Sequence, residues 1–292
     1  MNKKIFGCIA SLSLASILAM PTSTYPNDIT TSETIQKKVE VKQKSIEKIL
    51  VLEYHNITSD NSPIRNNRYA TTVSMFEKQM NLLNKKGYKT LTMEEFYKSL
   101  EEFRDTKSPD SLEGKLVLLT FDDGYKSVYE NAYPILKKNN MKATAFIIGA
   151  SIGNSSCLTI NQLIEMRDVF DIEGHTYNGH RFSKTNSTVH SNLFYKSEEE
   201  IEKDLTKSSD FIREIASKEI IAVAWPGGDY NKKMISAGKK AGYKLFFKAW
   251  GGPINKNSIV EEIPRIEVYG YYGETRERGI KTIEDFERIT GI

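Results

Sequence analysis

The chain has 292 residues, of which 39% are hydrophobic and 27% charged, so it is not a wholly disordered protein and is long enough for one large domain. Its formal net charge of +3 falls to +1 when Lys3 and Lys4 of the N-terminal segment are set aside, which is too weak to indicate nucleic acid as a partner. Cys157 is the one cysteine after residue 23, so we expect neither an internal disulfide nor a cysteine metal site.

The N-terminal segment has the pattern of an export signal. A short basic stretch at Lys3 and Lys4 precedes an apolar run over residues 5–20, which is short for a membrane span. We therefore expect residues 1–23 to be a signal peptide or an N-terminal anchor, residues 24–47 a polar linker, and residues 48–292 the folded domain. This predicts a secreted or cell-surface protein, associated with the membrane or cell wall if the anchor is retained.

Strands and helices alternate from residue 48 onward. Capping sequences and amphipathic patterns predict helices over residues 74–86, from Thr92, over 125–139 with a break at Pro134, and over 159–169, 197–217, 232–241 and 282–289. Apolar runs predict strands over residues 49–54, 116–120, 143–148, 170–173, 219–224, 245–247 and 266–268. This alternation predicts an α/β fold, a distorted (β/α) barrel of about seven strands that forms a single catalytic domain.

Unusual residues follow the carboxyl ends of four predicted strands. They are His55, the pair Asp122–Asp123, His175, and the sequence Trp225-Pro226. In barrels of this kind the carboxyl ends of the strands form the active face, so we expect these residues to share one site. The alternative for the acidic pair is a helix cap near Tyr125, which would explain one aspartate and Gly124 but not the other aspartate.

Two of the four histidines lie in one short stretch, His175-Thr176-Tyr177-Asn178-Gly179-His180. With one carboxylate they form a His, His, Asp set, which is typical of a catalytic zinc site with open positions. The alternative is a polar loop whose histidines bond only to backbone groups. The nearby pair of aspartates favours the metal site.

The residues at these strand ends suit a hydrolysis. One aspartate would bind the metal, and the other would accept a proton from water whose pKa the metal lowers. The tight loop Trp225-Pro226-Gly227-Gly228 would offer a backbone N–H to the oxyanion. His55 would protonate the leaving group, whereas His190 lies in a polar stretch and is expected to be merely exposed.

Two of these sequences resemble known motifs. Thr120-Phe121-Asp122-Asp123-Gly124 resembles the first motif of the NodB-type polysaccharide deacetylases, carbohydrate esterase family 4, and the stretch from His175 to His180 resembles the second. The resemblance covers about residues 48–268. It implies that Asp122 is the catalytic base and that Asp123, His175 and His180 bind a divalent metal. Zinc is expected, with cobalt, nickel, manganese or iron as alternatives.

Departures from the family pattern point to the subgroup that deacetylates poly-β-1,6-N-acetylglucosamine in biofilms. The two motif histidines stand one residue further apart than in most members. The usual C-terminal histidine is absent, and Tyr54-His55 resembles the N-terminal Tyr-His that supplies this subgroup's general acid. The usual arginine before Pro226 is also absent.

Two further positions bear on this resemblance. Ile263-Pro264-Arg265-Ile266 resembles the subgroup's C-terminal segment, which implies that Arg265 orients Asp122 in place of the missing arginine. Gly227 stands where the subgroup usually has tyrosine or phenylalanine, so a ring that lines the substrate groove is missing and the substrate preference is open.

The resemblance implies a secreted, metal-dependent N-deacetylase of N-acetylglucosamine polysaccharides, with the β-1,6-linked polymer favoured. Alternatives are a peptidoglycan or chitin-oligomer deacetylase, an O-acetyl xylan esterase, an Fe(II) oxygenase with the same ligands, and a glycan-binding protein with a degenerate site. We expect a monomer whose partner is an extracellular polysaccharide and not nucleic acid. Aromatic residues that could line a sugar groove are Tyr177, Tyr230, Trp250, Tyr269, Tyr271 and Tyr272.

Overall fold

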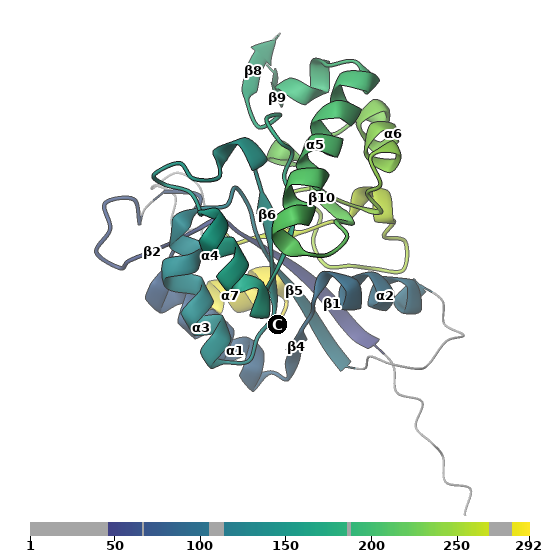
Figure 1. Cartoon of the computed structure of the whole chain (residues 1–292). Helices are drawn as coiled ribbons and strands as arrows, with labels where there is room; N and C mark the ends of the chain where they lie inside the picture. The colour runs from purple at the N-terminus through teal and green to yellow at the C-terminus, as the bar shows by residue number, and fades with distance from the viewer. Residues whose placement is uncertain (1–45, 66, 105–113, 186–187, 269–281) are drawn as a thin grey trace, which may run out of the picture. The chain divides into compact units, whose positions relative to one another are not determined.

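The computed structural model describes residues 46–65, 67–104, 114–185, 188–268 and 282–292 (Figure 1). The expected signal segment, nearly all of the expected linker, and Tyr269, Tyr271 and Tyr272 lie outside the described residues. The contacts of the chain separate Met1–Lys42 from a compact unit, Gln43–Ile292, and the fold below is that of the second unit. Within the described ranges, no helix has the length and apolar character needed to cross a membrane.

The second unit is built on one sheet of eight parallel strands. They are β1 (Ile46–Tyr54), β4 (Tyr88–Thr90), β5 (Gly114–Phe121), β6 (Ala143–Ile147), β7 (Phe170–Gly174), β10 (Ala222–Ala224), β11 (Leu245–Phe247) and β12 (Ile266–Glu267). Seven follow the order β11-β10-β7-β6-β5-β1-β12, and β4 pairs beside the first half of β5. The apolar runs of β1 and β5 suit strands that are buried on both faces.

One short segment joins the two edges of this sheet. Ile263 pairs in parallel with Phe247 of β11, and three residues later β12 pairs with Leu52 and Glu53 of β1. The segment Ile263–Glu267 therefore passes from one edge to the other and curls the seven-strand path into a half-barrel. This confirms the predicted distorted (β/α) barrel of about seven strands.

Helices connect the strands and carry most of the predicted caps. They are α1 (Val73–Lys85), α2 (Met93–Arg104), α3 (Tyr133–Lys138), α4 (Ile160–Glu165), α5 (Glu198–Ala216), α6 (Lys232–Lys240) and α7 (Ile283–Thr290). Thr92, Thr159 and Ser197 cap their helices as predicted. The cap of α1 is Thr72, whose hydroxyl accepts the Met75 N–H, and not Ser74. Pro134 lies in the first turn of α3, directly after a π-helical turn, so the predicted break is confirmed.

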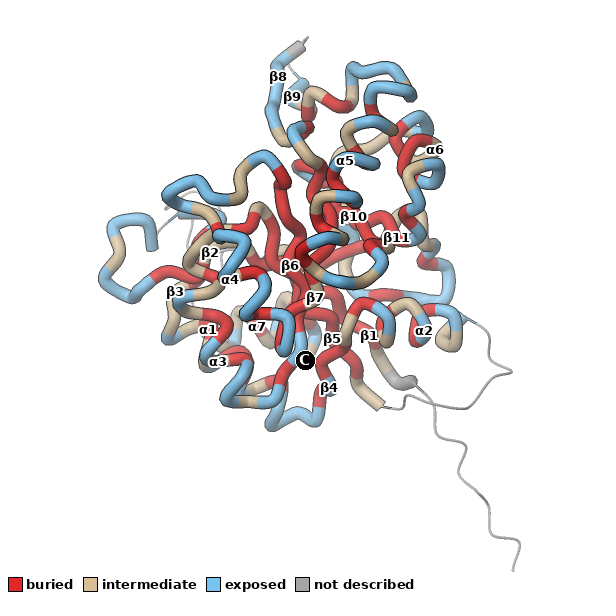
Figure 2. The backbone as a smooth tube through the Cα atoms, viewed as in Figure 1, coloured by how far each residue is buried: buried red, intermediate tan, exposed pale blue. Residues whose placement is uncertain are grey.

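Alternate residues of the strands face two different cores, as the pleat of a strand requires. The inner face, as we call it, carries Ile49, Val51, Leu116, Leu118, Phe146, Ala222, Ala224, Leu245 and Phe247, which pack with Met93, Phe96 and Leu100 of α2. The outer face carries Leu50, Leu52, Val117 and Leu119 and packs with α1, α3, α4, α5, α6 and α7. Figure 2 shows this buried centre in red, with the exposed surfaces of the helices around it.

Several short elements were not predicted, because three or four residues carry too little pattern to identify a strand. They are β4, the parallel pair β2 (Asn56–Thr58) and β3 (Ala70–Thr72), and the antiparallel hairpin β8 (Phe182–Thr185) and β9 (Thr188–Ser191). The predicted strand over residues 219–224 is shortened to β10. Its first part is not a strand because the N–H groups of Ile221 and Ala222 donate to the Glu173 carboxylate instead of a neighbouring strand.

Candidate active site

Three predicted residues lie at one end of the inner face, two of them because of the alternation of side chains along the strands. His55 lies four residues after Val51, and Asp122 lies four residues after Leu118, so both continue the inner-face series. Arg265 lies on the segment that joins the sheet edges, and its guanidinium reaches the same place. The site is therefore formed at the carboxyl ends of the strands.

Asp122 is 2% exposed and is held by Arg265. Nη1 and Nη2 of Arg265 donate to Oδ1 and Oδ2 of Asp122, each at 2.8 Å, and Nε donates to the Lys248 carbonyl at 2.9 Å. Burial alone would raise the pKa of Asp122, but the charge and hydrogen bonds of Arg265, with the charges of His175 and His55, together outweigh burial and lower it. Asp122 is therefore an ionised carboxylate with a fixed orientation, as the sequence resemblance implies.

Glu53 is a second carboxylate on Arg265, and the sequence analysis missed it. Its Oε1 lies 3.2 Å from Arg265 Nη2 and 3.8 Å from His55 Nε2. Burial raises the pKa of Glu53 well above its ordinary value, although Arg265 opposes the shift. The sequence did contain an indication of this role. Glu53 is a charged residue within the apolar run of residues 49–54, where burial without a partner would be costly.

Asp123 diverges from Asp122 because the backbone turns sharply after β5. Asp123 has a φ of 72° and Gly124 a φ of 74°, in the left-handed region that a non-glycine residue seldom adopts. The turn brings Asp123 Oδ1 to 3.4 Å from His175 Nε2 and 3.2 Å from His180 Nε2. The following helical residues begin at Lys126, so neither aspartate holds the position directly before them, which is that of Tyr125.

The loop between the two histidines is fixed through its backbone. The His175 N–H donates to the Ile147 carbonyl at 2.9 Å, which extends the β6–β7 pairing by one residue. Thr176 has a φ of 70°, and its hydroxyl accepts the Gly179 N–H at 3.1 Å. A β-branched residue with a positive φ persists only where its surroundings hold it there.

Asp204 of α5 holds the same loop from outside. Its Oδ1 accepts the Tyr177 N–H and its Oδ2 accepts the Asn178 N–H, both at 2.9 Å. Burial raises the pKa of Asp204, against the two N–H donors that stabilise the ionised form. No local pattern identifies this residue in the sequence, because it lies 26 residues from the backbone that it binds.

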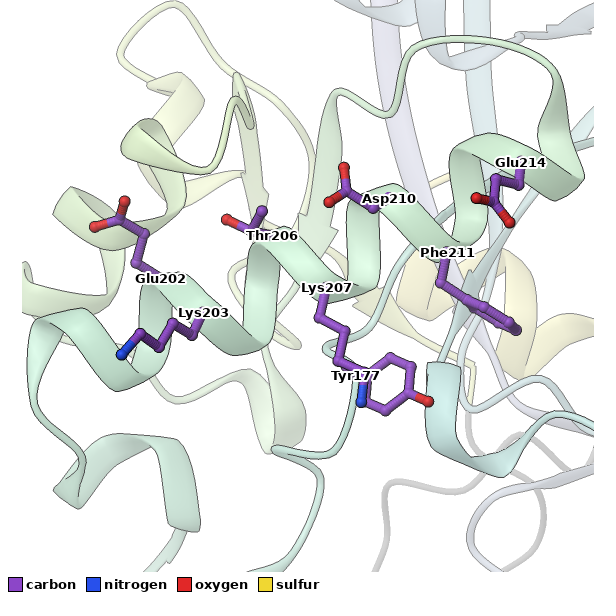
Figure 3. A pocket seen from close by; sticks show the side chains of 8 residues that line it. All are labelled: Tyr177, Glu202, Lys203, Thr206, Lys207, Asp210, Phe211 and Glu214. Carbon is purple, nitrogen blue, oxygen red and sulfur yellow. The ribbon is translucent and has the colours of Figure 1, made fainter.

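Tyr177 lies outside the rim that holds the metal-site side chains. Its ring packs against α5, edge-on to Phe211 at 6.0 Å and with Lys207 Nζ 3.9 Å from its centre (Figure 3). It lines a 620 Å³ pocket there with residues of α5. The expectation that Tyr177 lines a sugar groove stays a prediction, and the pocket that its ring lines is formed with α5.

The geometry of Asp123, His175 and His180 fits a divalent cation. The Nδ1–H of His175 donates to the Ala224 carbonyl at 2.8 Å, because a carbonyl can only accept. In the neutral ring, Nε2 then presents a lone pair to Asp123 Oδ1, which is buried and has no hydrogen-bond partner. A cation between these facing acceptors would satisfy both, and one ligand atom from each of the three residues lies within 4.8 Å of the others.

The pKa shifts of His180 and Asp123 favour the forms that bind a metal. Burial lowers the pKa of His180 to about 4, and the neighbouring His175 adds to this effect, so the ring is neutral and can bind a cation. Burial would raise the pKa of Asp123, but the histidines outweigh it and lower it. Burial would lower the pKa of His175, but Asp122 and Asp123 outweigh it and raise it.

His55 lies between the Arg265 cluster and the solvent. Its ring contacts that of Tyr69 at 4.8 Å, and one ligand atom each from His55, Glu53 and Asp122 lie within 4.8 Å of one another. Burial lowers the pKa of His55, although Asp122 and Asp123 oppose the shift. A lowered pKa makes a protonated His55 a stronger acid.

The structure corrects the prediction for Trp225. Its side chain is 1% exposed and stacks on Phe246 of the outer-face core at 5.8 Å, and its N–H donates to the Phe247 carbonyl at 3.0 Å. Trp225 follows the outer-face series, so neither its ring nor its N–H is available to a substrate.

The turn Pro226–Gly228 lies against the exposed ring of Trp250. A Cβ on Gly228 would lie 2.7 Å from the ring of Trp250, which is 49% exposed. Within Pro226–Gly228, the Gly228 N–H is already bonded to the Trp225 carbonyl at 2.8 Å. Since Pro226 has no N–H, Gly227 is the residue whose N–H could serve an oxyanion.

His190 is not merely exposed, which corrects a second prediction. Its Nδ1 lies 2.9 Å from Asp229 Oδ2, and its ring stacks on Phe194 at 4.1 Å.

Tyr230 is partly buried against the outer-face core, and Cys157 is a partly exposed free thiol.

Known proteins are similar to this chain in sequence and in fold. The family model described as polysaccharide deacetylase matches residues 110–246. The poly-beta-1,6-N-acetyl-D-glucosamine N-deacetylase of Staphylococcus aureus (strain MSSA476) is 32% identical, over 87% of this chain and 90% of that protein. The Streptococcus pyogenes deacetylase PplD, solved with acetate, is 26% identical with a TM-score of 0.68, over 84% of this chain and 99% of that one.

A further solved structure supports the fold alone. IcaB from Ammonifex degensii has a TM-score of 0.65 at 23% identity, over 77% of this chain and 93% of that one. The family match and the S. aureus relative, together with the site geometry, establish the family. The chain belongs to the polysaccharide deacetylase family (NodB, carbohydrate esterase family 4), hydrolases that cleave the amide bond of N-acetyl groups.

Proposed function

We propose that this protein is a secreted, metal-dependent N-deacetylase of N-acetylglucosamine polymers, with poly-β-1,6-N-acetylglucosamine as the favoured substrate. One observation carries the mechanism. Asp122, held by Arg265, stands beside a separate set of Asp123, His175 and His180 that fits a cation. The two acidic groups therefore have different partners and can perform different tasks.

In this proposal Asp122 accepts a proton from the attacking water as the water oxygen bonds to the acetyl carbon. Asp123, His175 and His180 would hold the cation, which when bound lowers the pKa of water and polarises the acetyl carbonyl. The Gly227 N–H stabilises the developing oxyanion. His55 donates a proton to the sugar nitrogen as the C–N bond breaks, so that acetate and a free amine leave.

Arg265 and Glu53 position the base in this scheme. The bidentate contact of Arg265 keeps Asp122 ionised and in one orientation, and Glu53 Oε1, 3.2 Å from Nη2 of Arg265, helps to fix the guanidinium. Neither residue needs to touch the substrate. Loss of Arg265 would affect the reaction through Asp122.

The choice of polymer rests on sequence similarity along nearly the whole chain. The S. aureus poly-beta-1,6-N-acetyl-D-glucosamine N-deacetylase is 32% identical over 87% of this chain. Peptidoglycan, chitin oligomers and acetylated xylan stay as alternatives, because the same acid, base and cation set would act on each of them. The oxygenase alternative is disfavoured by membership in a hydrolase family.

Zinc is the proposed metal, because two imidazoles and one carboxylate form a typical catalytic zinc set. Cobalt, nickel, manganese and iron are alternatives with the same ligands. The proposal of a secreted or surface-held protein rests on the basic start and apolar run of residues 3–20.

The test is an acetate-release assay on purified protein with oligomers of β-1,6-linked N-acetylglucosamine, chitin oligomers, peptidoglycan and acetylxylan. Each substrate is assayed with zinc, cobalt, nickel, manganese or iron, and after chelation. We expect release from the β-1,6 oligomers that chelation stops and added metal restores. Release only from acetylxylan would overturn the N-deacetylase proposal, and release that chelation leaves unchanged would overturn the role of the metal.

A further inference from the structure

The β8–β9 hairpin begins two residues after His180 and projects from the domain beside α5, at the top of Figure 1. It is a separate two-stranded sheet, in which Phe182 pairs with Ser191 and Ser183 with His190. A lone hairpin of this length has little stability by itself, so its position depends on contacts with the rest of the domain.

Two contacts dock the hairpin on the Pro226–Asp229 turn. His190 Nδ1 lies 2.9 Å from Asp229 Oδ2. At the other strand, a Cβ on Gly227 would lie 2.9 Å from the ring of Phe182, so the ring rests on a backbone that has no side chain in the way. Gly227 also has a φ of 64°, which a residue with a side chain seldom adopts.

The same ring of Phe182 reaches the proposed metal ligand. It lies edge-on to the His180 ring, with 5.2 Å between the ring centres and 88° between the planes. Yet Phe182 is 45% exposed. Its position is thus set on two sides, by Gly227 and His180, while nearly half of its surface faces solvent.

We propose that Phe182 is a specificity-determining residue that stacks on the apolar face of the sugar whose acetyl group is removed. An exposed aromatic ring beside a polar catalytic centre suits a ligand with a flat C–H face and a polar edge, which is the form of a pyranose ring. The inference rests on the proposed function and adds the residue that recognises the sugar. The sequence analysis did not identify it, because Phe182 is an ordinary residue in a polar stretch.

If Phe182 had only a structural role, different changes in kcat and KM would be expected on its removal. If Phe182 only supported His180, its loss would weaken metal binding and lower kcat. If it recognises the sugar, its loss should raise KM and leave the zinc affinity and the melting temperature unchanged. The two roles therefore separate in the split between KM and kcat.

The experiment compares Phe182→Ala, Phe182→Leu and Phe182→Tyr with the unaltered protein, all zinc-loaded, on β-1,6-linked N-acetylglucosamine oligomers. We expect roughly a three- to tenfold rise in KM for the alanine and leucine variants, the range for one aromatic contact, and a near-normal KM for tyrosine. Val189→Ala, on the same hairpin and 54% exposed, is the control and should behave as the unaltered protein.

Binding measured without turnover gives the second readout. The oligomer is titrated into zinc-loaded Asp122→Asn protein and into the Asp122→Asn, Phe182→Ala double variant, and the double variant should bind more weakly by the same factor. A leucine variant with normal KM, or an alanine variant that loses zinc affinity and kcat at unchanged KM, overturns the inference. If the unaltered protein neither binds nor deacetylates any of the glycans, the proposed function fails first and this inference with it.

Discussion

Asp122 and Asp123 are adjacent in sequence but belong to two clusters of opposite character. Asp122 shares a buried cluster with Glu53 and Arg265, where the protein supplies its own positive charge at 2.8 Å. Asp123 belongs with His175 and His180, where its Oδ1 is buried without a hydrogen-bond partner. The first cluster is complete in the folded chain, whereas the second, in our proposal, binds a cation.

This difference arises from a single backbone turn. Asp122 continues the inner-face series of β5, and Asp123 enters the left-handed region and points to the histidine loop. The two groups are nevertheless linked, because Asp122 Oδ2 lies 3.9 Å from His175 Nε2. A short turn thus places a proton acceptor beside a cation site without making it one of the three ligands.

The largest expected effect is on turnover by Asp122→Asn. The amide keeps the shape of the side chain but cannot act as a base, so kcat should fall by roughly 10²–10⁴-fold. Zinc affinity, measured by competition with a coloured chelator, should stay normal. A variant with normal kcat would break the distinction between the two clusters.

Arg265→Met should cost about 3–5 kcal/mol of the free energy of unfolding, because Asp122 and Glu53 would stay buried without their cation. Urea denaturation of the zinc-loaded proteins measures this. Arg288→Met is the matched control, since Arg288 is 63% exposed and its ion pair with Asp285 should contribute about 0–1 kcal/mol. Equal losses in the two variants would contradict the account of the Arg265 cluster.

Asp204→Asn should weaken zinc binding by about 10–100-fold, the usual range for a group that orients metal ligands. The asparagine can accept only one of the two N–H groups at Tyr177 and Asn178 and turns an NH₂ group toward the other. Asp210→Asn, on the same helix and 61% exposed, should leave zinc affinity unchanged. Normal zinc affinity in Asp204→Asn would show that the loop holds its shape without α5.

A further expected effect, outside the two clusters, is a change in pH dependence at Glu173, a third buried carboxylate. Burial raises its pKa from 4.5 to about 7, so its contribution to stability is complete below pH 4.5 and is lost as the pH rises through 7. Glu173→Gln keeps an oxygen for the N–H groups of Ile221 and Ala222 but cannot ionise.

The stability of Glu173→Gln relative to the unaltered protein should therefore rise between pH 4.5 and 7, by at most about 1.4 kcal/mol for each pH unit. Urea denaturation of both proteins at several pH values measures it. A difference that stays constant with pH would mean that Glu173 is ionised throughout, with Lys218, 3.3 Å away, as its partner.

The sequence allowed the long elements and the chemistry at strand ends to be predicted, for physical reasons. Apolar runs identify β1 and β5, and parallel strands bring their carboxyl ends together, so His55, Asp122 and His175 could be assigned to one site. The contact between Arg265 and Asp122 followed only from the family resemblance, because 143 residues separate them.

What the sequence left out depends on tertiary contacts. Asp204 and Phe182 matter through the backbone and ring that they touch, and no local pattern records those partners. The prediction for Trp225 failed because the residue beside a conspicuous turn lies on the outer-face side of β10. Because successive side chains of a strand point to opposite faces, Ala224 and Trp225 cannot both face the site.

The most direct test of the account is a side-by-side zinc titration and acetate-release assay of Asp122→Asn and Asp123→Asn. We predict that Asp122→Asn binds zinc as the unaltered protein does and releases almost no acetate, while Asp123→Asn loses high-affinity zinc binding. If both variants lost zinc equally, or if Asp122→Asn alone lost it, the assignment of one aspartate to the proton and the other to the metal would be contradicted.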